Sequence, residues 1–408
     1  MSAAAAAELA ARQAYGRLVA ILAARTRDVA AAEDALSEAF HAALRRWPET
    51  GMPENPVAWL LTAARRQHGH AHRHIQVRAA AEPTLRLLLE EAPETADIPD
   101  RRLQLLMVCA HPAIALEAQA PLMLQTVLGL DAARIAACFL TSPAAMSQRL
   151  VRAKARIRDA GIGFELPGAA ELPARLDSVM NAIYAAFGTG WADLLADGAG
   201  GTGLVEEAIW LARLLVALLP GAPEPKGLLA LMLYAAARRG ARRDAAGRFV
   251  PLSAQDPQAW SRAFIAEAEA LLRDAARAAL PGRFQIEAAI QSVHVEARIT
   301  GADRAAALLA LYDLLARLSP TAGVLVARAA AIADAGHAQA ALRELDGLAG
   351  ELAGYQPWWA TRAHVLGLLG EAEAAREARR RAAGLAEDPA VRAWLLGAQD
   401  HAGPRNQA

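Results

Sequence analysis

Cysteine is scarce in this chain of 408 residues. The two cysteines, Cys109 and Cys138, each lie among apolar neighbours, and no CxxC pair occurs. This scarcity excludes a disulfide framework and a zinc knuckle, and it is typical of a protein in a reducing compartment. We therefore expect a cytoplasmic protein with no metal centre built on cysteine.

The chain also lacks long hydrophobic runs, an excess of either charge and a high aromatic content. Its longest apolar stretch without a charged residue, 227–237, is far shorter than the roughly 20 residues that span a bilayer. The N-terminus has Glu8 and no basic segment of the secretory type. Basic and acidic residues number 43 each, and aromatic residues make up 5%. These features predict a soluble protein without a membrane partner, and they argue against an all-β fold built on aromatic strands.

Alanine, by contrast, makes up about a quarter of the chain, which favours helices. A hydrophobic content of 55% supplies ample core material, and 21% charged residues argues against wholesale disorder. No segment alternates convincingly between apolar and polar residues, as a half-buried strand would. We therefore predict an all-α fold, in a chain whose length suits two or three domains.

Shifts in composition divide the chain into four parts. We predict a first helical domain over 1–74 and a linker over 75–99, where prolines and acidic residues accumulate. A second helical domain is expected over 100–166. A long helical region over 167–408 follows.

The first domain is predicted to contain a helix over 28–47, followed by a proline-rich turn over 48–56. Asn55 is expected to cap the next helix, with Pro56 at its first position. The predicted core positions of the first helix follow helical spacing: Val29, Leu36, Ala39, Phe40, Ala43 and Leu44. Its opposite face is expected to present three acidic residues: Glu33, Asp34 and Glu38.

A helix-turn-helix pattern is the strongest local signal of the second domain. A helix over 131–139 is joined by Leu140 and Thr141 to a helix over 143–160. Ser142 is a good N-cap and Pro143 a good first helical residue. The predicted core of the second helix is one stripe: Met146, Leu150, Ala153 and Ile157.

The remaining faces of this second helix are polar and basic, with no acidic residue between Ser142 and Arg158. In a recognition helix the N-terminal side chains contact base edges, while later cations neutralise phosphates. A solvated basic helix is the alternative. The combination of cap, turn and charge favours DNA binding, with these candidate residues: Ser142, Ala144, Ala145, Ser147, Gln148, Arg149, Arg152, Lys154 and Arg156.

An internal repeat occurs near the C-terminus. The segment 336–341 recurs as 370–375, an offset of 34 residues, and Arg328 and Arg362 share that offset. This is the tetratricopeptide period, in which helix pairs stack and leave a concave face for a partner. We predict a repeat of this type that binds another protein or a ligand.

Several segments taken together resemble bacterial extracytoplasmic-function (ECF) sigma factors, members of the sigma-70 superfamily. The segments that resemble their second region are 32–40, 47–48 and 55–65, and those that resemble their fourth region are 101–105, 111–113 and 148–154. The segment 247–252, with Gln255, Trp260, Gln285 and His294, is similar to a branch of that family with a long tetratricopeptide-like C-terminal extension. The resemblance therefore covers nearly the whole chain.

The resemblance implies a factor that starts transcription and has neither enzyme activity nor a cofactor. Its partners would be core RNA polymerase, through the β′ clamp helices and the β flap, and promoter DNA. The acidic residues Glu33, Asp34 and Glu38 would contact the clamp helices. Three residues would meet the minus-10 element: Trp59, Arg65 and Arg66. The helix that begins after Ser142 would contact minus-35.

Some residues depart from the family pattern. The segment 67–74 is rich in histidine where the family continues with Asn, Asp and arginines, and Ala327 and Arg304 replace an expected Asn and Trp. These departures motivate an alternative, a helical-repeat scaffold whose sigma-like half no longer initiates transcription. A third hypothesis is a metal-dependent enzyme that uses the i, i+4 histidine pairs of 68–74. We favour contact with DNA or an exposed helix end, and expect no metal.

Two further candidates have simpler explanations. The glycine-rich segment 198–203 has no preceding strand and no following Gly-Lys-Ser/Thr, so a helix connection is preferred to a phosphate cradle. Tyr355, Trp358 and Trp359 are interpreted as packing between repeats rather than as a ligand patch.

Overall fold

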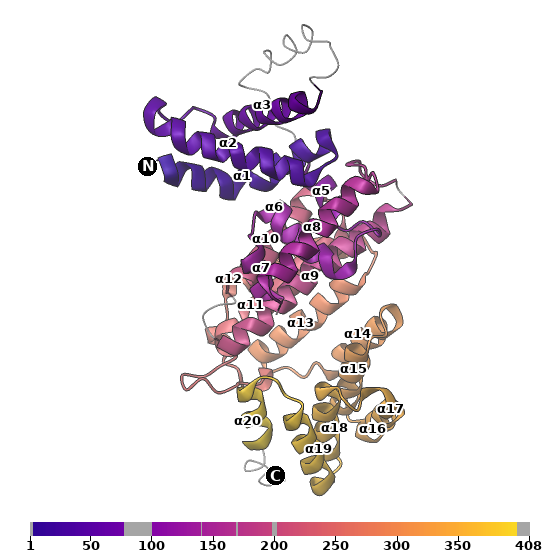
Figure 1. Cartoon of the computed structure of the whole chain (residues 1–408). Helices are drawn as coiled ribbons and strands as arrows, with labels where there is room; N and C mark the ends of the chain where they lie inside the picture. The colour runs from indigo at the N-terminus through magenta and orange to yellow at the C-terminus, as the bar shows by residue number, and fades with distance from the viewer. Residues whose placement is uncertain (1–2, 77–99, 140, 169, 198–201, 398–408) are drawn as a thin grey trace. The chain divides into compact units, whose positions relative to one another are not determined.

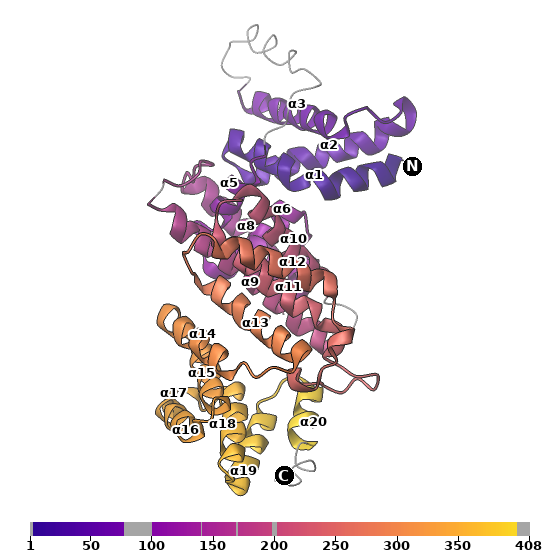
Figure 2. The same cartoon turned by 180° about the vertical axis from the view of Figure 1, so that it is seen from behind.

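The computed structural model describes residues 3–76, 100–139, 141–168, 170–197 and 202–397. Within these ranges the regular structure is helical, and pairing of strand type is limited to an isolated bridge between Arg243 and Phe249. The predicted all-α fold is therefore confirmed. The chain forms two compact units, Met1–Leu211 and Ala212–Ala408, each of which is described by itself (Figures 1 and 2). None of the helices in the described part is long and apolar enough to cross a bilayer.

Unit 1 begins with three helices followed by a second group. The first three are α1 (Ala3–Thr26), α2 (Val29–Thr50) and α3 (Pro56–Gln76). The second group comprises α5 (Arg102–Cys109), α6 (Leu116–Leu128), α7 (Ala132–Cys138), α8 (Pro143–Asp159) and α9 (Leu172–Asp197). Helix α10 (Thr202–Leu218) runs across the boundary of the two units. The predicted linker over 75–99 lies outside the described residues from position 77 onward.

Both ends of α2 show why these residues form a helix. The Asp28 carboxylate accepts a hydrogen bond from the Ala31 N–H at 3.1 Å, which caps the first turn. At the other end the predicted turn begins too early, because Pro48 lies inside the helix, which continues to Thr50. Gly51, at a φ of 81°, then ends it. Asn55 caps α3 as predicted, with its side-chain oxygen 3.0 Å from the Ala58 N–H.

The core stripe of α2 differs from the predicted one at two positions. Leu44 is 46% exposed and Phe40 is half-buried, whereas Trp47 is buried. Helical geometry explains the difference, because Trp47 lies four residues after Ala43 on the buried stripe and Leu44 is rotated by about 100° from it. The other four predicted core residues of α2 are buried as expected: Val29, Leu36, Ala39 and Ala43.

The two groups of helices in unit 1 pack directly on each other. Helix α1 contacts α5 and α6 as well as α2 and α3, and α2 contacts α8. Helix α9 packs on α5 and α6, where the Arg175 Nη1 donates to the Met107 carbonyl at 3.1 Å. The boundary predicted at residue 166 stays a prediction, and α9, which follows it, is part of the core of unit 1.

Unit 2 contains three tightly packed helices, a turn-rich segment and a series of helix pairs. The first part comprises α11 (Pro223–Ala237), the 3-10 turns η1 (Arg239–Ala241), η2 (Leu252–Ala254) and η3 (Pro257–Ala259), α12 (Arg262–Ala276), α13 (Arg283–Thr300) and α14 (Ala305–Leu318). The second part comprises α15 (Ala322–Asp334), α16 (Ala338–Gly347), α17 (Ala349–Leu352), α18 (Gln356–Leu368), α19 (Ala372–Gly384) and α20 (Pro389–Gly397).

The helix pairs confirm the 34-residue repeat. The pair α15 and α16 begins at Ala322 and Ala338, and the pair α18 and α19 begins 34 residues later in each case, at Gln356 and Ala372. Gly336 and Gly370 make the two turns with φ of 90° and 80°, a conformation that favours glycine.

Arginines at equivalent positions of the two pairs both bond to an acidic residue of a preceding helix. Arg328 bonds to Asp313 of α14 at 2.6 Å, and Arg362, 34 residues further on, bonds to Asp346 of α16. Arg328 also bonds forward to Glu344 of α16 at 2.7 Å, whereas the position equivalent to Glu344 in the second pair is Ala378. The predicted aromatic packing is confirmed for Trp358, which is 3% exposed and donates its indole N–H to the Leu345 carbonyl at 3.0 Å.

Candidate nucleic-acid interface

Helices α7 and α8 pack on each other and show the capping and burial that the helix-turn-helix pattern predicts. The Ser142 hydroxyl accepts a hydrogen bond from the Ala145 N–H at 3.2 Å, and Pro143 occupies the first turn of α8. The four predicted core residues of α8 are all buried: Met146, Leu150, Ala153 and Ile157. Ile135 of α7 is also buried, while Phe139 is half-buried. This core fixes which faces of α8 remain open.

Most of the candidate DNA-binding side chains lie on those open faces. Those exposed to solvent are Ser142, Ala144, Ala145, Ser147, Gln148, Arg152 and Arg156. Arg149 is half-buried, with its Nη1 3.5 Å from the Glu117 carbonyl oxygen of α6. Lys154 differs from the others because it is turned toward α2 and is only 12% exposed.

The three acidic residues of α2 differ in how far their side chains are exposed to solvent. Asp34 and Glu38 are exposed, as expected of a surface for a basic partner. Glu33 was expected on the same open face, but its side chain is 13% exposed and forms an ion pair with Lys154. Burial raises the pKa of the Glu33 carboxyl, and the charge of Lys154 opposes that rise. The pKa of Tyr15, which is hydrogen-bonded to Glu33, is also raised, mainly by burial.

The three candidate minus-10 residues of α3 lie in different environments. Trp59 is half-buried and packs edge to face against Trp47, with ring centroids 5.5 Å apart. Burial and the nearby Arg25 lower the pKa of Arg65, whereas Arg66 is exposed. Trp59 therefore supports the α2–α3 hairpin as well as contributing to its surface. The helix backbone extends through the histidine-rich segment, but the histidine side chains lie outside the described residues.

Sequence reasoning missed the contact that joins these surfaces. The pair formed by Glu33 and Lys154 links a residue expected to face polymerase with one expected to face DNA, and Arg158 approaches Asp28 in the same way, at 3.9 Å. Both pairs connect α2 to α8. The sequence holds no signal for this pairing beyond the opposite charges of the two helices.

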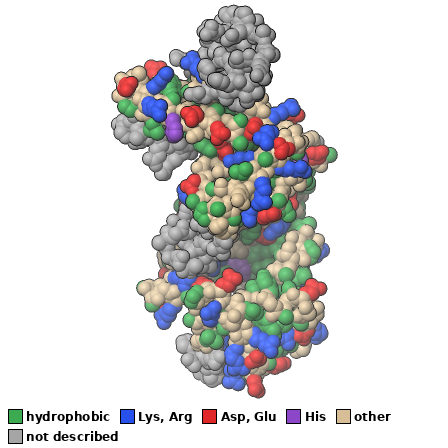
Figure 3. All heavy atoms as spheres, in the orientation of Figure 1, with side chains coloured by type: hydrophobic (Ala, Val, Ile, Leu, Met, Phe, Trp, Pro, Cys, Tyr) green, Lys and Arg blue, Asp and Glu red, His purple; other side chains and the backbone are tan. Residues whose placement is uncertain are grey.

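Charge elsewhere on the described surface is mixed. On the face shown in Figure 3 basic and acidic side chains are interspersed, so that face shows no large field of one sign. Interspersed charges of this kind give weak, strongly salt-dependent attraction to a DNA backbone.

Reactive groups are sparse among the described residues. No group of three or more His, Cys, Asp or Glu side chains there is arranged to hold a metal ion. Burial raises the pKa of the Cys109 thiol to about 12, although a hydrogen bond with Thr126 opposes the rise. A thiol with so high a pKa is a poor nucleophile near neutral pH. The segment 198–201 of the glycine-rich loop lies outside the described residues.

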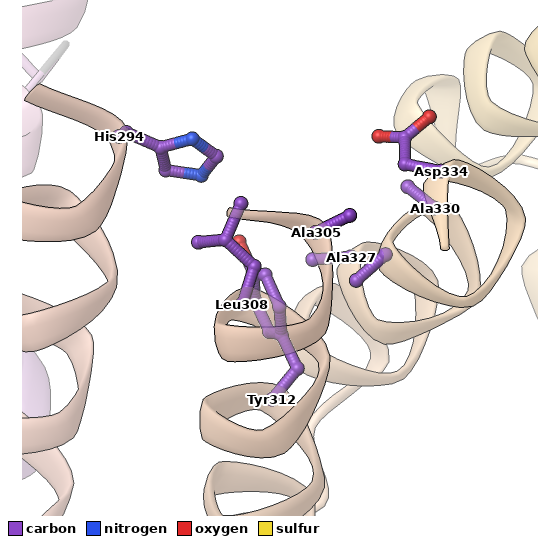
Figure 4. Close-up of a pocket in the computed structure, with 8 residues that line it drawn as sticks. His294, Ala305, Leu308, Tyr312, Ala327, Ala330 and Asp334 are labelled. Atoms are coloured by element: carbon purple, nitrogen blue, oxygen red, sulfur yellow. The ribbon is translucent and has the colours of Figure 1, made fainter. Parts of the chain in front are cut away.

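A small cavity of about 120 Å³ lies in unit 2, between α13, α14 and α15. Figure 4 shows His294 of α13 facing Leu308 and Tyr312 of α14, with Asp334 of α15 on the far side. The remaining lining consists of alanines: Ala305, Ala327, Ala330 and Ala331. Burial and the charge of Arg238 lower the pKa of His294. The Asp334 carboxylate also lies 2.8 Å from the ring of His364, a residue that does not line the cavity.

Comparison with known proteins places the whole chain in a family. It is 38% identical over 384 residues to an uncharacterized protein of Rhizobium meliloti (strain 1021), with 92% of this chain and 90% of that protein aligned. The chain belongs to the family of that protein. A model described as a family of unknown function (DUF6596) matches residues 175–276 of this family member. No solved structure matches it.

A more distant relative of this family member has a stated role. Over 164 residues the chain is 32% identical to the probable RNA polymerase sigma factor RfaY of Xanthomonas campestris pv. campestris. The alignment covers 36% of this chain and 40% of that protein. The similarity to a sigma factor is therefore partial.

Proposed function

We propose that this chain is an RNA polymerase sigma factor of the ECF type, which binds core polymerase and promoter DNA and lacks enzyme activity. The observation that carries the proposal is the capped α7–α8 hairpin, whose second helix has a buried apolar stripe and exposed polar residues at its N-terminal end. Base-reading helices are built in this way, because their first turns enter the major groove. The partial similarity to the probable sigma factor supports the same class.

Each open surface then has a role in the proposal. Ser147, Gln148 and Arg152 contact the minus-35 element, and the exposed Arg156 further along α8 contacts a phosphate. Arg65 and Arg66 on α3 meet the minus-10 element. Asp34 and Glu38 bind the clamp helices of the polymerase. Unit 2 stabilises or regulates this half through its repeat surface. Such a protein works in the cytoplasm.

Charge reversal of the exposed acidic residues tests polymerase binding. We expect wild-type protein to co-elute with core RNA polymerase and Asp34→Arg/Glu38→Arg to bind about tenfold more weakly or not at all, because like charges then oppose each other. The matched control is Glu371→Arg/Glu373→Arg, which makes the same change in net charge on exposed positions of unit 2. Equal loss in both variants would contradict a specific surface on α2.

A helical-repeat scaffold is the second candidate, favoured by the matching helix bounds of the two pairs in unit 2. Stacked pairs of this kind commonly bind other proteins. The same co-elution experiment separates the candidates. A wild-type chain that fails to bind core polymerase would remove the sigma proposal and leave the scaffold.

A further inference from the structure

The cavity between α13, α14 and α15 has a polar group at each of two opposite ends and an apolar middle. His294 stands at one end and Asp334 at the other, with Leu308 and Tyr312 of α14 between them (Figure 4). Alanines make up the rest of the lining. Asp334 is exposed and most other lining residues are half-buried, so solvent reaches the cavity. A small molecule can therefore enter it.

The end at His294 lies beside an arginine without an acidic partner. Arg238, half-buried at the end of α11, donates a hydrogen bond at 2.5 Å to Gln291, which precedes His294 by three residues on the same face of α13. Within the part of the chain that the structure describes, Arg238 forms no ion pair. Burial and the neighbouring Arg242 lower the pKa of Arg238 to about 10. The guanidinium therefore stays charged at neutral pH.

Nearby acidic residues do not compensate this charge, because they are paired with other arginines. Asp388 forms an ion pair with Arg243 at 2.9 Å, and Glu296 forms one with Arg304 at 2.7 Å. A partly desolvated cation without a partner costs free energy. Arg238 is thus a group that an anion from solution stabilises.

The opposite end of the cavity has a carboxylate that is only partly engaged. The Asp334 Oδ1 atom lies 2.8 Å from the His364 ring, and no other side chain of the described residues bonds to this carboxylate. The Asp334 side chain is 56% exposed. Because a carboxylate accepts hydrogen bonds at both oxygens, the second oxygen is available to an ammonium group in the cavity.

The volume of the cavity limits the size of the ligand. Its 120 Å³ is slightly less than the roughly 150 Å³ of a cavity that holds benzene. Pockets for cofactors and drug-sized molecules are larger, at roughly 300 to 1,000 Å³. The cavity therefore suits a ligand of about six non-hydrogen atoms.

We propose that this cavity binds a small amino acid in its zwitterionic form. The ligand carboxylate accepts a hydrogen bond from His294 and is stabilised by the charge of Arg238, while its ammonium group donates to Asp334. The carbon atoms between the two groups contact the alanines, Leu308 and Tyr312. A simple carboxylic acid or a simple amine satisfies only one end. The site lies within unit 2 and does not depend on the proposed sigma function.

A series of amino acids of increasing length tests the site. Glycine, β-alanine, 4-aminobutyrate and 5-aminovalerate are titrated into the full-length chain by calorimetry. We expect one member to bind best, because only one spacing of the charges matches the two ends. It binds at least about tenfold more tightly than the carboxylic acid and the amine of the same length. The proposal is overturned if no member binds at about 10 mM, or if the acid or the amine binds equally well.

Two variants of α15 locate the binding. Asp334→Asn removes the charge at the exposed end, and Ala327→Leu fills the cavity. We expect each to weaken binding of the best amino acid at least about tenfold. The controls are Glu351→Gln and Ala322→Leu, at exposed positions of unit 2, which keep the wild-type affinity. Wild-type affinity in Asp334→Asn or Ala327→Leu, or an equal loss in the controls, overturns the site.

A third variant separates binding from stability. Arg238→Gln removes a half-buried charge without an acidic partner, so we expect the ligand-free variant to resist urea at least as well as the wild type. Its affinity for the amino acid falls at least about tenfold, whereas Arg376→Gln, at an exposed position of α19, leaves the affinity unchanged. A folded Arg238→Gln chain with wild-type affinity would remove the carboxylate end of the site and with it the proposal.

Discussion

At the scale of single residues, His294 illustrates how burial makes stability depend on pH. Its ring is half-buried, and burial together with Arg238 lowers its pKa in the folded chain. The unfolded state therefore takes up a proton first as the pH falls below about 6.5. The stabilisation from the neutral ring is complete above that value and is lost between the unfolded and the folded pKa.

We expect the urea midpoint of the wild-type chain to fall between about pH 7.5 and about pH 5.5, and His294→Asn to reduce this fall. Urea unfolding, monitored by circular dichroism at the two pH values, measures this fall in the midpoint. The control is His337→Asn, at an exposed position of unit 2. The prediction is wrong if His294→Asn and the wild type lose the same stability on acidification.

Single residues also show where sequence reasoning succeeds and fails. The caps at Ser142 and Asn55 were predictable because a cap depends only on residues within one turn. The inward position of Glu33 was not, because it depends on Lys154, which is distant in sequence. Asp34 is exposed and Glu33 is nearly buried although they are adjacent.

At the scale of elements, the turns of the repeat have equivalent roles. Gly336 and Gly370 both adopt positive φ between the helices of their pair. We expect Gly336→Ala and Gly370→Ala each to lower the free energy of unfolding by about 1 kcal/mol, because alanine is strained in this conformation. Urea unfolding measures the effect, and Gly350→Ala, without positive φ and with open space around it, is the control. Unequal losses at the two turns would contradict their equivalence.

Helices were predicted well where apolar residues recur at helical spacing, and poorly where the predicted end depended on a single proline. The helices predicted over 131–139 and 143–160 lie within one residue of the observed bounds of α7 and α8 at each end. The predicted end of α2 was wrong because Pro48 was expected to stop the helix, whereas the helix continues to Thr50, and the adjacent Trp47 is buried and packs against Trp59 of α3. The α2–α8 contact has no local pattern and could not be predicted.

At the scale of the whole molecule, α9 determines where a shortened chain can end and still fold as unit 1. Val179 and Ile183 of α9 are buried, and the helix packs on α5 and α6. We expect a chain that ends at Pro167 to aggregate, because the surfaces of α5 and α6 lose their cover, and a chain that ends at Leu218 to melt cooperatively. Size-exclusion chromatography and thermal melting compare the two. A soluble, cooperatively folded chain ending at Pro167 would contradict the role of α9.

The matching bounds of the two helix pairs also constrain which insertions and deletions the chain can accept. Because each pair contacts mainly its neighbours, a complete pair can be gained or lost while the remaining junctions stay the same. Insertions of any other size would displace the glycine turns relative to the helices they join. The stack of helix pairs in unit 2 can therefore grow or shrink in steps of one pair, a constraint that would apply equally to evolution and to protein engineering.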